Sequence, residues 1–453
     1  MARRLISAAA SVGAAGTTTW RARRPSLMTW PSWVGPAVTG ALAGAAAATA
    51  WFATDTAMQA RTRPGLLVRR PLIAGAAAGG VLVLATAARS LLLPRLEQGG
   101  RDLDAGLPDP PGEPTVSGGP GSSVDYHRLG REGARYVHTP TPPHSIEEVM
   151  GQPAVATPIR VFIGWDSAES IDERVDLAMK ELHRTGAFER STLLVQSPAG
   201  SGYANPTPAQ VVEIATRGDC ASVAVGYGLL PSFLSLDRVE LAAHTQRMLL
   251  DRVFAEVAAR PADARPRVLL YGESLGARVQ QRAIDPAALE SLGVSSALWV
   301  GTPGGVDSDR FRRGLTDEPV IVDRPEQLPR PLPRPHPPVW FLEHDGDPVV
   351  RLRRDLLHRR PRWLTDQPRG RNIPEAMSWW PVVTWVQVLI DTLFATNIKP
   401  GEFDSRGHDY RADLGAVVAA AYDLPLPEGA EGRLEEVLRR LEVERARRVE
   451  GGI

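Results

Sequence analysis

The chain has little of several residue types that would define its class. Its single cysteine, Cys220, excludes an internal disulfide framework and a cysteine-based zinc cluster. The 52 basic residues are matched by 52 acidic ones, and this zero net charge argues against a general nucleic-acid-binding protein. Charged residues make up only 23% of the chain, and hydrophobic residues 43%, which excludes disorder over most of the 453 residues.

A long uncharged region stands near the N-terminus. Residues 25–54 lack charged side chains, and a second uncharged run covers residues 71–88. Apolar segments of about twenty residues match the hydrocarbon thickness of a bilayer. We therefore predict a membrane region over residues 1–100, with transmembrane helices at about 34–53 and 72–93. A buried Ala-rich hairpin is the alternative.

The arginines around these runs favour one orientation. Seven flank the outer ends of the two predicted spans and four lie between the spans. Arginine is enriched on the cytoplasmic side of membrane proteins. The count predicts a multi-pass protein of the cell membrane, with the bilayer as a partner and the rest of the chain in the cytoplasm.

After residue 150 the sequence alternates between strand-like and helix-like patterns. We expect a Pro/Gly-rich linker at 101–150, an α/β domain at 151–425 and a C-terminal amphipathic helix at 426–453. Such alternation is typical of a mostly parallel sheet with helices on both faces. The predicted strands cover residues 159–163, 192–195, 222–225, 268–271, 297–300 and 339–342.

One motif in this pattern carries chemistry. The run GESLG at 272–276 follows a predicted strand and precedes a predicted helix. The pattern G-x-S-x-G in this setting is typical of a nucleophile elbow, in which a tight turn raises the serine hydroxyl above the carboxyl edge of the sheet. It predicts Ser274 as the nucleophile. A serine in an ordinary βα turn is the alternative.

The elbow also predicts where its partners lie, because the acid and the histidine follow the nucleophile in chain order. Asp347, in the loop after the sixth strand, is the candidate acid, with Asp345 as its competitor. His408, the last histidine in the chain, is the candidate base. His344 and His358 lie too close to the acid in sequence for that role.

A serine that attacks an acyl carbonyl from such an elbow needs two backbone N–H groups to stabilise the oxyanion that forms. Leu275, directly after the serine, supplies the first. The second is expected from Gly200, Ser201 or Gly202, which follow the strand at 192–195. No metal or cofactor is predicted, because the acids and histidines around residue 345 lack a recognised ligand spacing.

Several blocks of the sequence resemble a known family. The segments IRVFIGWDSAES, LYGESLGA, HDGDPVV, WWPVVTWVQVLID and GHDY are similar to the actinobacterial membrane-associated α/β-hydrolase family. The resemblance covers about residues 125–425. It implies an α/β-hydrolase fold with Ser274, Asp347 and His408 at the matching triad positions.

The sixty residues between Asp347 and His408 exceed what a connection needs, so we expect a cap-like insertion at about 351–405. Its arginines and tryptophans fit a cap that touches anionic lipid headgroups, and they equally fit a covering helix with solvated arginines. Together these features predict a membrane-anchored serine hydrolase that cleaves a carboxylic ester or thioester, with a lipid-like substrate favoured. A catalytically silent scaffold or sensor at the membrane is the alternative.

Overall fold

The structure is a computed structural model, and it describes residues 93–365, 369–395, 401, 403 and 405–451. Both predicted transmembrane spans therefore lie outside the described residues. Within the described part, no helix combines the length and the apolar character needed to cross a bilayer. The chain divides into two units, and the unit of residues 96–396 and 400–453 contains every strand and helix named below.

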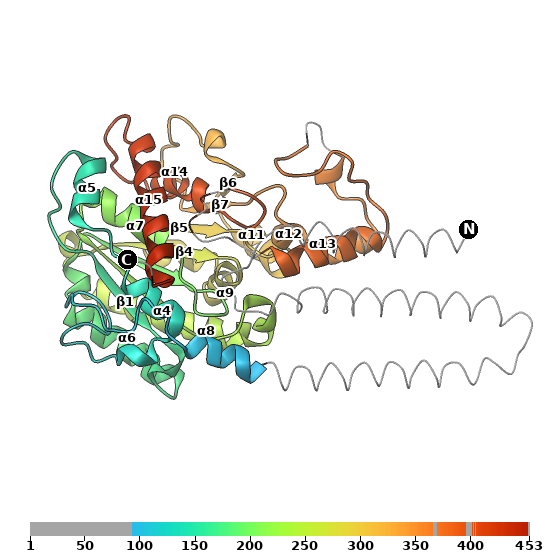
Figure 1. Cartoon of the computed structure of the whole chain (residues 1–453). Helices are drawn as coiled ribbons and strands as arrows, with labels where there is room; N and C mark the ends of the chain where they lie inside the picture. The colour runs from blue at the N-terminus through green and yellow to red at the C-terminus, as the bar shows by residue number, and fades with distance from the viewer. Residues whose placement is uncertain (1–92, 366–368, 396–400, 402, 404, 452–453) are drawn as a thin grey trace, which may run out of the picture. The chain divides into compact units, whose positions relative to one another are not determined.

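A seven-stranded sheet forms the centre of this unit (Figure 1). All neighbouring strands pair in parallel, in the order β1-β3-β2-β4-β5-β7-β6. The six strands expected from the sequence are all present. The strands are β1 (Ile159–Ile163), β2 (Thr192–Ser197), β3 (Cys220–Val225), β4 (Arg267–Glu273), β5 (Val294–Val300), β6 (Val320–Val322) and β7 (Val339–Leu342).

Helices cover both faces of the sheet, as the sequence pattern predicts (Figure 1). One face packs against α4 (Gly130–Val137), α6 (Ile171–Arg184), α8 (Val239–Ala258), α9 (Leu275–Ala283) and α11 (Val306–Gly314). The other packs against α5 (Pro143–Met150), α7 (Pro206–Ala215), α14 (Arg411–Ala421) and α15 (Glu431–Val449). Successive strand residues serve opposite faces, so Trp299 and Leu298 belong to different apolar clusters.

Local signals in the sequence explain where helices begin and end. Ser170 caps α6 by accepting a hydrogen bond from the N–H of Glu173 at 3.2 Å, and the Glu173 carboxylate accepts the N–H of Ser170 at 3.0 Å. This reciprocal capping box satisfies two N–H groups that lack partners within the helix. Gly186 follows the helix with φ 69°, a conformation that glycine adopts without steric cost.

The expectation of a linker at 101–150 is wrong. This stretch contains α4 and α5, and its Tyr126, Tyr136 and Ile146 are buried in the two apolar clusters. Val116 also forms a parallel bridge with Arg160 of β1. Proline and glycine here shape turns between packed pieces, and the buried aromatic and aliphatic side chains attach those pieces to the domain.

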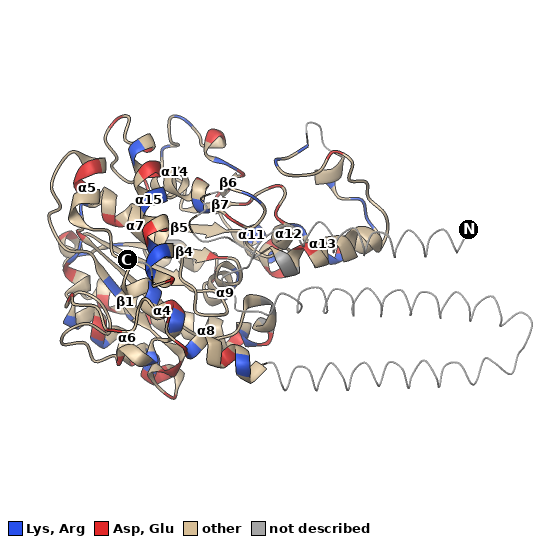
Figure 2. Ribbon diagram, in the orientation of Figure 1, with Lys and Arg blue, Asp and Glu red and all other residues tan. Residues whose placement is uncertain are grey.

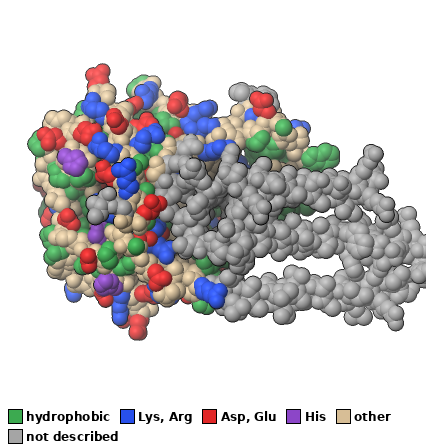
Figure 3. Space-filling model, in the orientation of Figure 1, with side chains coloured by type: hydrophobic (Ala, Val, Ile, Leu, Met, Phe, Trp, Pro, Cys, Tyr) green, Lys and Arg blue, Asp and Glu red, His purple; other side chains and the backbone are tan. Residues whose placement is uncertain are grey.

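The described surface mixes charges of both signs (Figures 2 and 3).

The C-terminal amphipathic helix, predicted at 426–453, is α15, which buries Leu434, Val437 and Leu438 against α14. One strand was not expected from the sequence. β6 has only three residues and pairs with β7 at the edge of the sheet, so its sequence carries little periodicity.

Candidate active site

Ser274 occupies a strained turn between β4 and α9. Its backbone has φ 55° and ψ −127°, a region that costs a non-glycine residue about 1–3 kcal/mol. The N–H of Ser274 donates to the carbonyl oxygen of Val300 at 2.9 Å, which fixes the turn to the end of β5. The side chain is only partly buried. The serine therefore stands at the carboxyl edge of the sheet, where the motif places it.

The two glycines of the motif are required by packing. A Cβ atom at Gly272 would lie 2.7 Å from the Cα of Ala277, in the first turn of α9. A Cβ atom at Gly276 would collide with the carbonyl oxygen of Ser197, at the end of β2. Side chains at these positions would push α9 away from β4 and β2. The glycines thus let the helix approach closely enough to form the tight turn.

Asp347 and His408 are brought together from loops 61 positions apart. Nδ1 of His408 lies 2.7 Å from Oδ2 of Asp347, and both side chains are buried. The other carboxylate oxygen of Asp347 accepts the N–H of Val349 at 2.8 Å, at the start of α12 (Pro348–Arg351). Asp345 instead pairs with Arg351 at 2.7 Å. Of the two candidate acids, the structure places Asp347 against the histidine.

This pairing controls the protonation of His408. Burial by itself lowers the pKa of the imidazole, but the charge and hydrogen bond of Asp347 outweigh burial, so the pKa is raised. Because a carboxylate accepts hydrogen bonds, Nδ1 carries the proton in this pair. That leaves Nε2 as the ring nitrogen available to accept a proton.

The serine and the histidine adjoin the same piece of backbone. Val300 accepts the hydrogen bond from Ser274, and a Cβ atom on the next residue, Gly301, would lie 2.8 Å from Cε1 of His408. Gly301 also has φ 54°. Nε2 of His408 is buried and has no hydrogen-bond partner among the described residues. In unliganded sites, catalytic hydrogen bonds are often long and tighten only when substrate binds.

A buried network that the sequence did not reveal supports the pair. The hydroxyl of Tyr410 donates to Oδ2 of Asp347 at 2.6 Å, and burial raises its pKa well above the usual range, which keeps the hydroxyl protonated. The ring of His344 stacks on Tyr410 at 3.8 Å, with its Nδ1 2.8 Å from the carbonyl oxygen of Gly407. Nε2 of His344 contacts Asp413 at 2.8 Å. His344 thus holds the loop that carries His408.

A second polar residue lies within the elbow itself. Glu273, directly before Ser274, accepts hydrogen bonds from Asn205 and from the hydroxyl of Tyr271, both at 2.7 Å. Burial raises the pKa of this carboxyl group. Asn205 is the N-cap of α7, after the loop that follows β2. The contact therefore connects the elbow to the candidate oxyanion loop. In the sequence, the only sign of this contact was the acidic residue at the second position of the G-x-S-x-G motif.

The backbone N–H groups that are candidates for binding the oxyanion differ in whether they already donate a hydrogen bond. The N–H of Gly202 donates to Ala199 at 2.9 Å, and the N–H of Gly200 lies 3.4 Å from Oγ of Ser232. Within the described residues, the N–H groups of Ser201 and Leu275 donate to no other group. Leu275 begins α9, so its N–H has no partner inside the helix.

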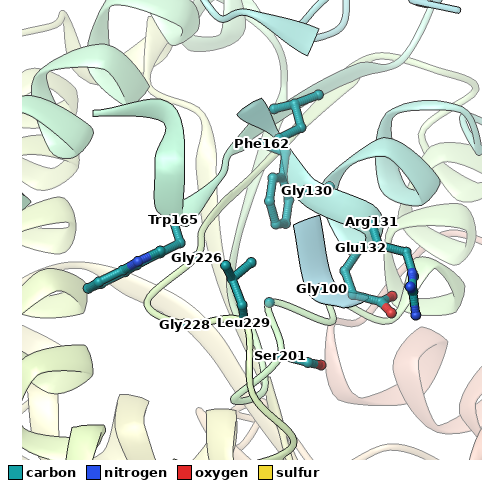
Figure 4. A pocket seen from close by; sticks show the side chains of 13 residues that line it. Gly100, Gly130, Arg131, Glu132, Phe162, Trp165, Ser201, Gly226, Gly228 and Leu229 are labelled. Carbon is teal, nitrogen blue, oxygen red and sulfur yellow. The ribbon is translucent and has the colours of Figure 1, made fainter. Parts of the chain in front are cut away.

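A small hollow lies beside this loop (Figure 4). It is lined by Ser201 and Gly202 together with Phe162, Trp165 and the glycines Gly226 and Gly228, which follow β3. Neither Ser274 nor His408 lines it. The hollow therefore borders the loop after β2 and does not enclose Ser274.

These features define a class. A parallel sheet covered on both faces, a serine held at positive φ between a strand and a helix, and a later acid–histidine pair are characteristic of α/β-hydrolases. The chain belongs to the alpha/beta-hydrolase family, whose model matches residues 159–430. Membership of this family supports a hydrolase. A search of curated proteins found no match.

Proposed function

We propose that the protein is a serine hydrolase that cleaves carboxylic esters or thioesters with Ser274 as its nucleophile. The observation that carries the proposal is the 2.7 Å contact between His408 and Asp347, next to the β5 end that also holds the elbow. A protonated Nδ1 leaves Nε2 free to act as the base. Ser274, in its strained turn at the same edge of the sheet, supplies the attacking hydroxyl group.

The proposed reaction has two halves. Ser274 Oγ attacks the acyl carbon while Nε2 of His408 takes the hydroxyl proton, and the N–H groups of Leu275 and Ser201 stabilise the oxyanion. Asp347 stabilises the imidazolium that forms. His408 then protonates the leaving alkoxide or thiolate. Water, deprotonated by His408, then attacks the acyl-enzyme, the bond to Ser274 Oγ breaks, and His408 returns the proton to Oγ as the acid leaves.

A bilayer location is part of the proposal. The apolar runs at 34–53 and 72–93, the second interrupted only by Arg89, support insertion as a hairpin, and the arginine count supports a cytoplasmic hydrolase domain. This location favours lipid-like substrates. A cysteine introduced at Ala105, in a Cys220→Ala background, tests the orientation. Labelling of that cysteine by an impermeant reagent on intact cells would contradict the cytoplasmic placement.

A fluorophosphonate probe tests the chemistry, because it phosphonylates serines that are activated by a neighbouring base. We expect the purified full-length protein to be labelled at one residue, Ser274, and labelling to fall at acidic pH as His408 becomes protonated. A folded protein that remains unlabelled would favour the silent scaffold or sensor instead. Labelling at a different serine would show that the nucleophile is assigned wrongly.

A further inference from the structure

Four exposed apolar side chains gather at one place on the domain. Trp380 is 65% exposed, Val383 61%, Val382 54% and Leu357 36%. The N–H of Val382 donates to the carbonyl oxygen of Leu357 at 3.1 Å, which brings the two segments together. We call these four residues the apolar tip. Only three other large hydrophobic side chains of the described part are exposed: Val155, Leu241 and Ile321.

The tip is built on a rigid base. It joins the start of α13 (Val383–Phe394) to the end of the short helix η8 (Arg354–Leu357), and α13 packs against both η8 and α12. The indole N–H of Trp379 donates to the carbonyl oxygen of Leu356 at 3.1 Å. Oγ1 of Thr392 donates to Pro348, directly after Asp347, at 3.1 Å. The tip is therefore held at a defined position relative to the acid loop.

Exposed arginines stand beside the apolar tip. Arg354, Arg359 and Arg360 are exposed and lie within three residues of Leu357. Among the described residues, no acidic side chain pairs with these three, since neighbouring Asp355 pairs with Arg353. α13 itself carries one charged residue, Asp391, and is otherwise uncharged (Figure 2). The local surface thus combines unneutralised positive charge with exposed tryptophan and valine.

We propose that the apolar tip inserts into the interface of an anionic lipid bilayer while the three arginines contact lipid phosphates. Tryptophan is favoured at the level of the headgroups, and arginine beside it binds anionic lipids. A protein partner would have to bury three unpaired guanidinium groups, whereas a lipid surface supplies their counter-ions. The proposal does not depend on the catalytic activity or on the predicted N-terminal spans.

A local reporter tests this contact in the full-length chain. Val383→Cys in a Cys220→Ala background carries an environment-sensitive fluorophore, and Val155→Cys, at a site of almost equal exposure (59%), is the matched control. The protein is combined with phosphatidylcholine vesicles, with or without phosphatidylglycerol, that contain quencher-labelled lipids. We expect a blue shift and lipid quenching at position 383 with the anionic vesicles, and neither effect at position 155.

A charge variant separates electrostatic from apolar contributions. Replacing Arg354, Arg359 and Arg360 by glutamine removes about 1 kcal/mol per arginine near an anionic surface, so the contact should weaken roughly a hundredfold. Raised salt should act in the same direction. A reporter at 383 that remains in water with anionic vesicles overturns the proposal. A blue shift without lipid also overturns it, and would identify a second copy if it depends on protein concentration, or the chain's own N-terminal residues if it does not.

Discussion

Two regions of the domain differ in which side chains they bury. The surroundings of the elbow bury polar side chains, whereas the segment that carries the apolar tip exposes apolar ones. Around the elbow, Asp347, Tyr410 and His344 are buried and bonded to one another or to backbone. At the tip, Trp380 and Val382 are exposed. Polar groups are therefore withdrawn from water where chemistry is expected, and apolar groups are presented to water where no chemistry is expected.

The contrast shows how one domain divides its tasks. A hydrogen bond in a buried network is strong and holds its partners in one geometry. An exposed apolar group contributes little to folding, since burial is what stabilises it. Substitutions near the elbow should therefore change turnover greatly, whereas substitutions at the tip should change neither turnover of a soluble ester nor stability. Four predictions test this division, from the largest effect to the smallest.

Loss of the nucleophile should have the largest effect. Ser274→Ala removes the attacking oxygen and should lower kcat for a short-chain ester by about 10⁶-fold, with no loss of stability. Steady-state hydrolysis and thermal unfolding check the two parts. Alanine keeps the same backbone strain, so it is a matched replacement. A variant that retains full activity would show that Ser274 is an ordinary turn residue.

The acid is the next test. Asp347→Asn should lower turnover by roughly 10³–10⁴-fold, because the amide disfavours the Nδ1-protonated tautomer of His408. Asp345→Asn, the control, breaks only the ion pair with Arg351 and should cost less than about tenfold. Both effects are measured as kcat on a soluble ester. If the two variants exchanged their effects, Asp345 would be the acid.

Tyr410→Phe should give a smaller change with a distinctive pH signature. Loss of a hydrogen bond to a carboxylate costs about 1.5–3 kcal/mol, so kcat/KM should fall by roughly 10–100-fold. The charge on Asp347 is then less dispersed, which raises the pKa of His408 further. Since the base acts when neutral, activity falls as the pH falls through this pKa, and the acidic limb of the profile should move to higher pH.

A matched tyrosine provides the control for that variant. The buried hydroxyl of Tyr422 donates to the carbonyl oxygen of Leu270 at 2.8 Å and does not touch Asp347. Tyr422→Phe should reduce stability to a similar extent but leave the pH profile in place. An unmoved profile in Tyr410→Phe as well would mean that Tyr410 is merely structural.

The smallest effect is expected at the tip. Trp380→Ala should change the free energy of unfolding by less than about 0.5 kcal/mol. Trp340→Ala, which empties a fully buried site in β7, should cost about 3–5 kcal/mol. Denaturant titration compares the two. A large loss of stability in Trp380→Ala would show that the tip is covered and would weaken the contrast between the two regions.

The sequence predicted those features that depend on neighbouring residues. The six strands expected from β-branched runs and the glycine spacing around Ser274 each follow from a local pattern. The choice of Asp347 and His408 followed from chain order, and the structure brings this pair together.

What sequence reasoning missed depends on contacts between distant loops. Tyr410 stands two positions after His408, but only the folded chain brings its hydroxyl to Asp347. His344 was considered only as a catalytic base or a metal ligand, although its ring stacks on Tyr410 and contacts Asp413. The lead-in at 101–150 was read from its prolines and glycines, while its widely spaced aromatic residues pack against the sheet. No local pattern encodes such tertiary contacts.

The C-terminal helix has a consequence for the timing of synthesis. Glu442 of α15 pairs with buried Arg411, which in turn bonds Asp409 at 2.7 Å, next to His408. Ser274 emerges from the ribosome well before Glu442 does. A nascent chain therefore carries Ser274 long before the helix that anchors the His408 loop has been made. The proposed hydrolase should remain inert until α15 has been synthesised and has docked.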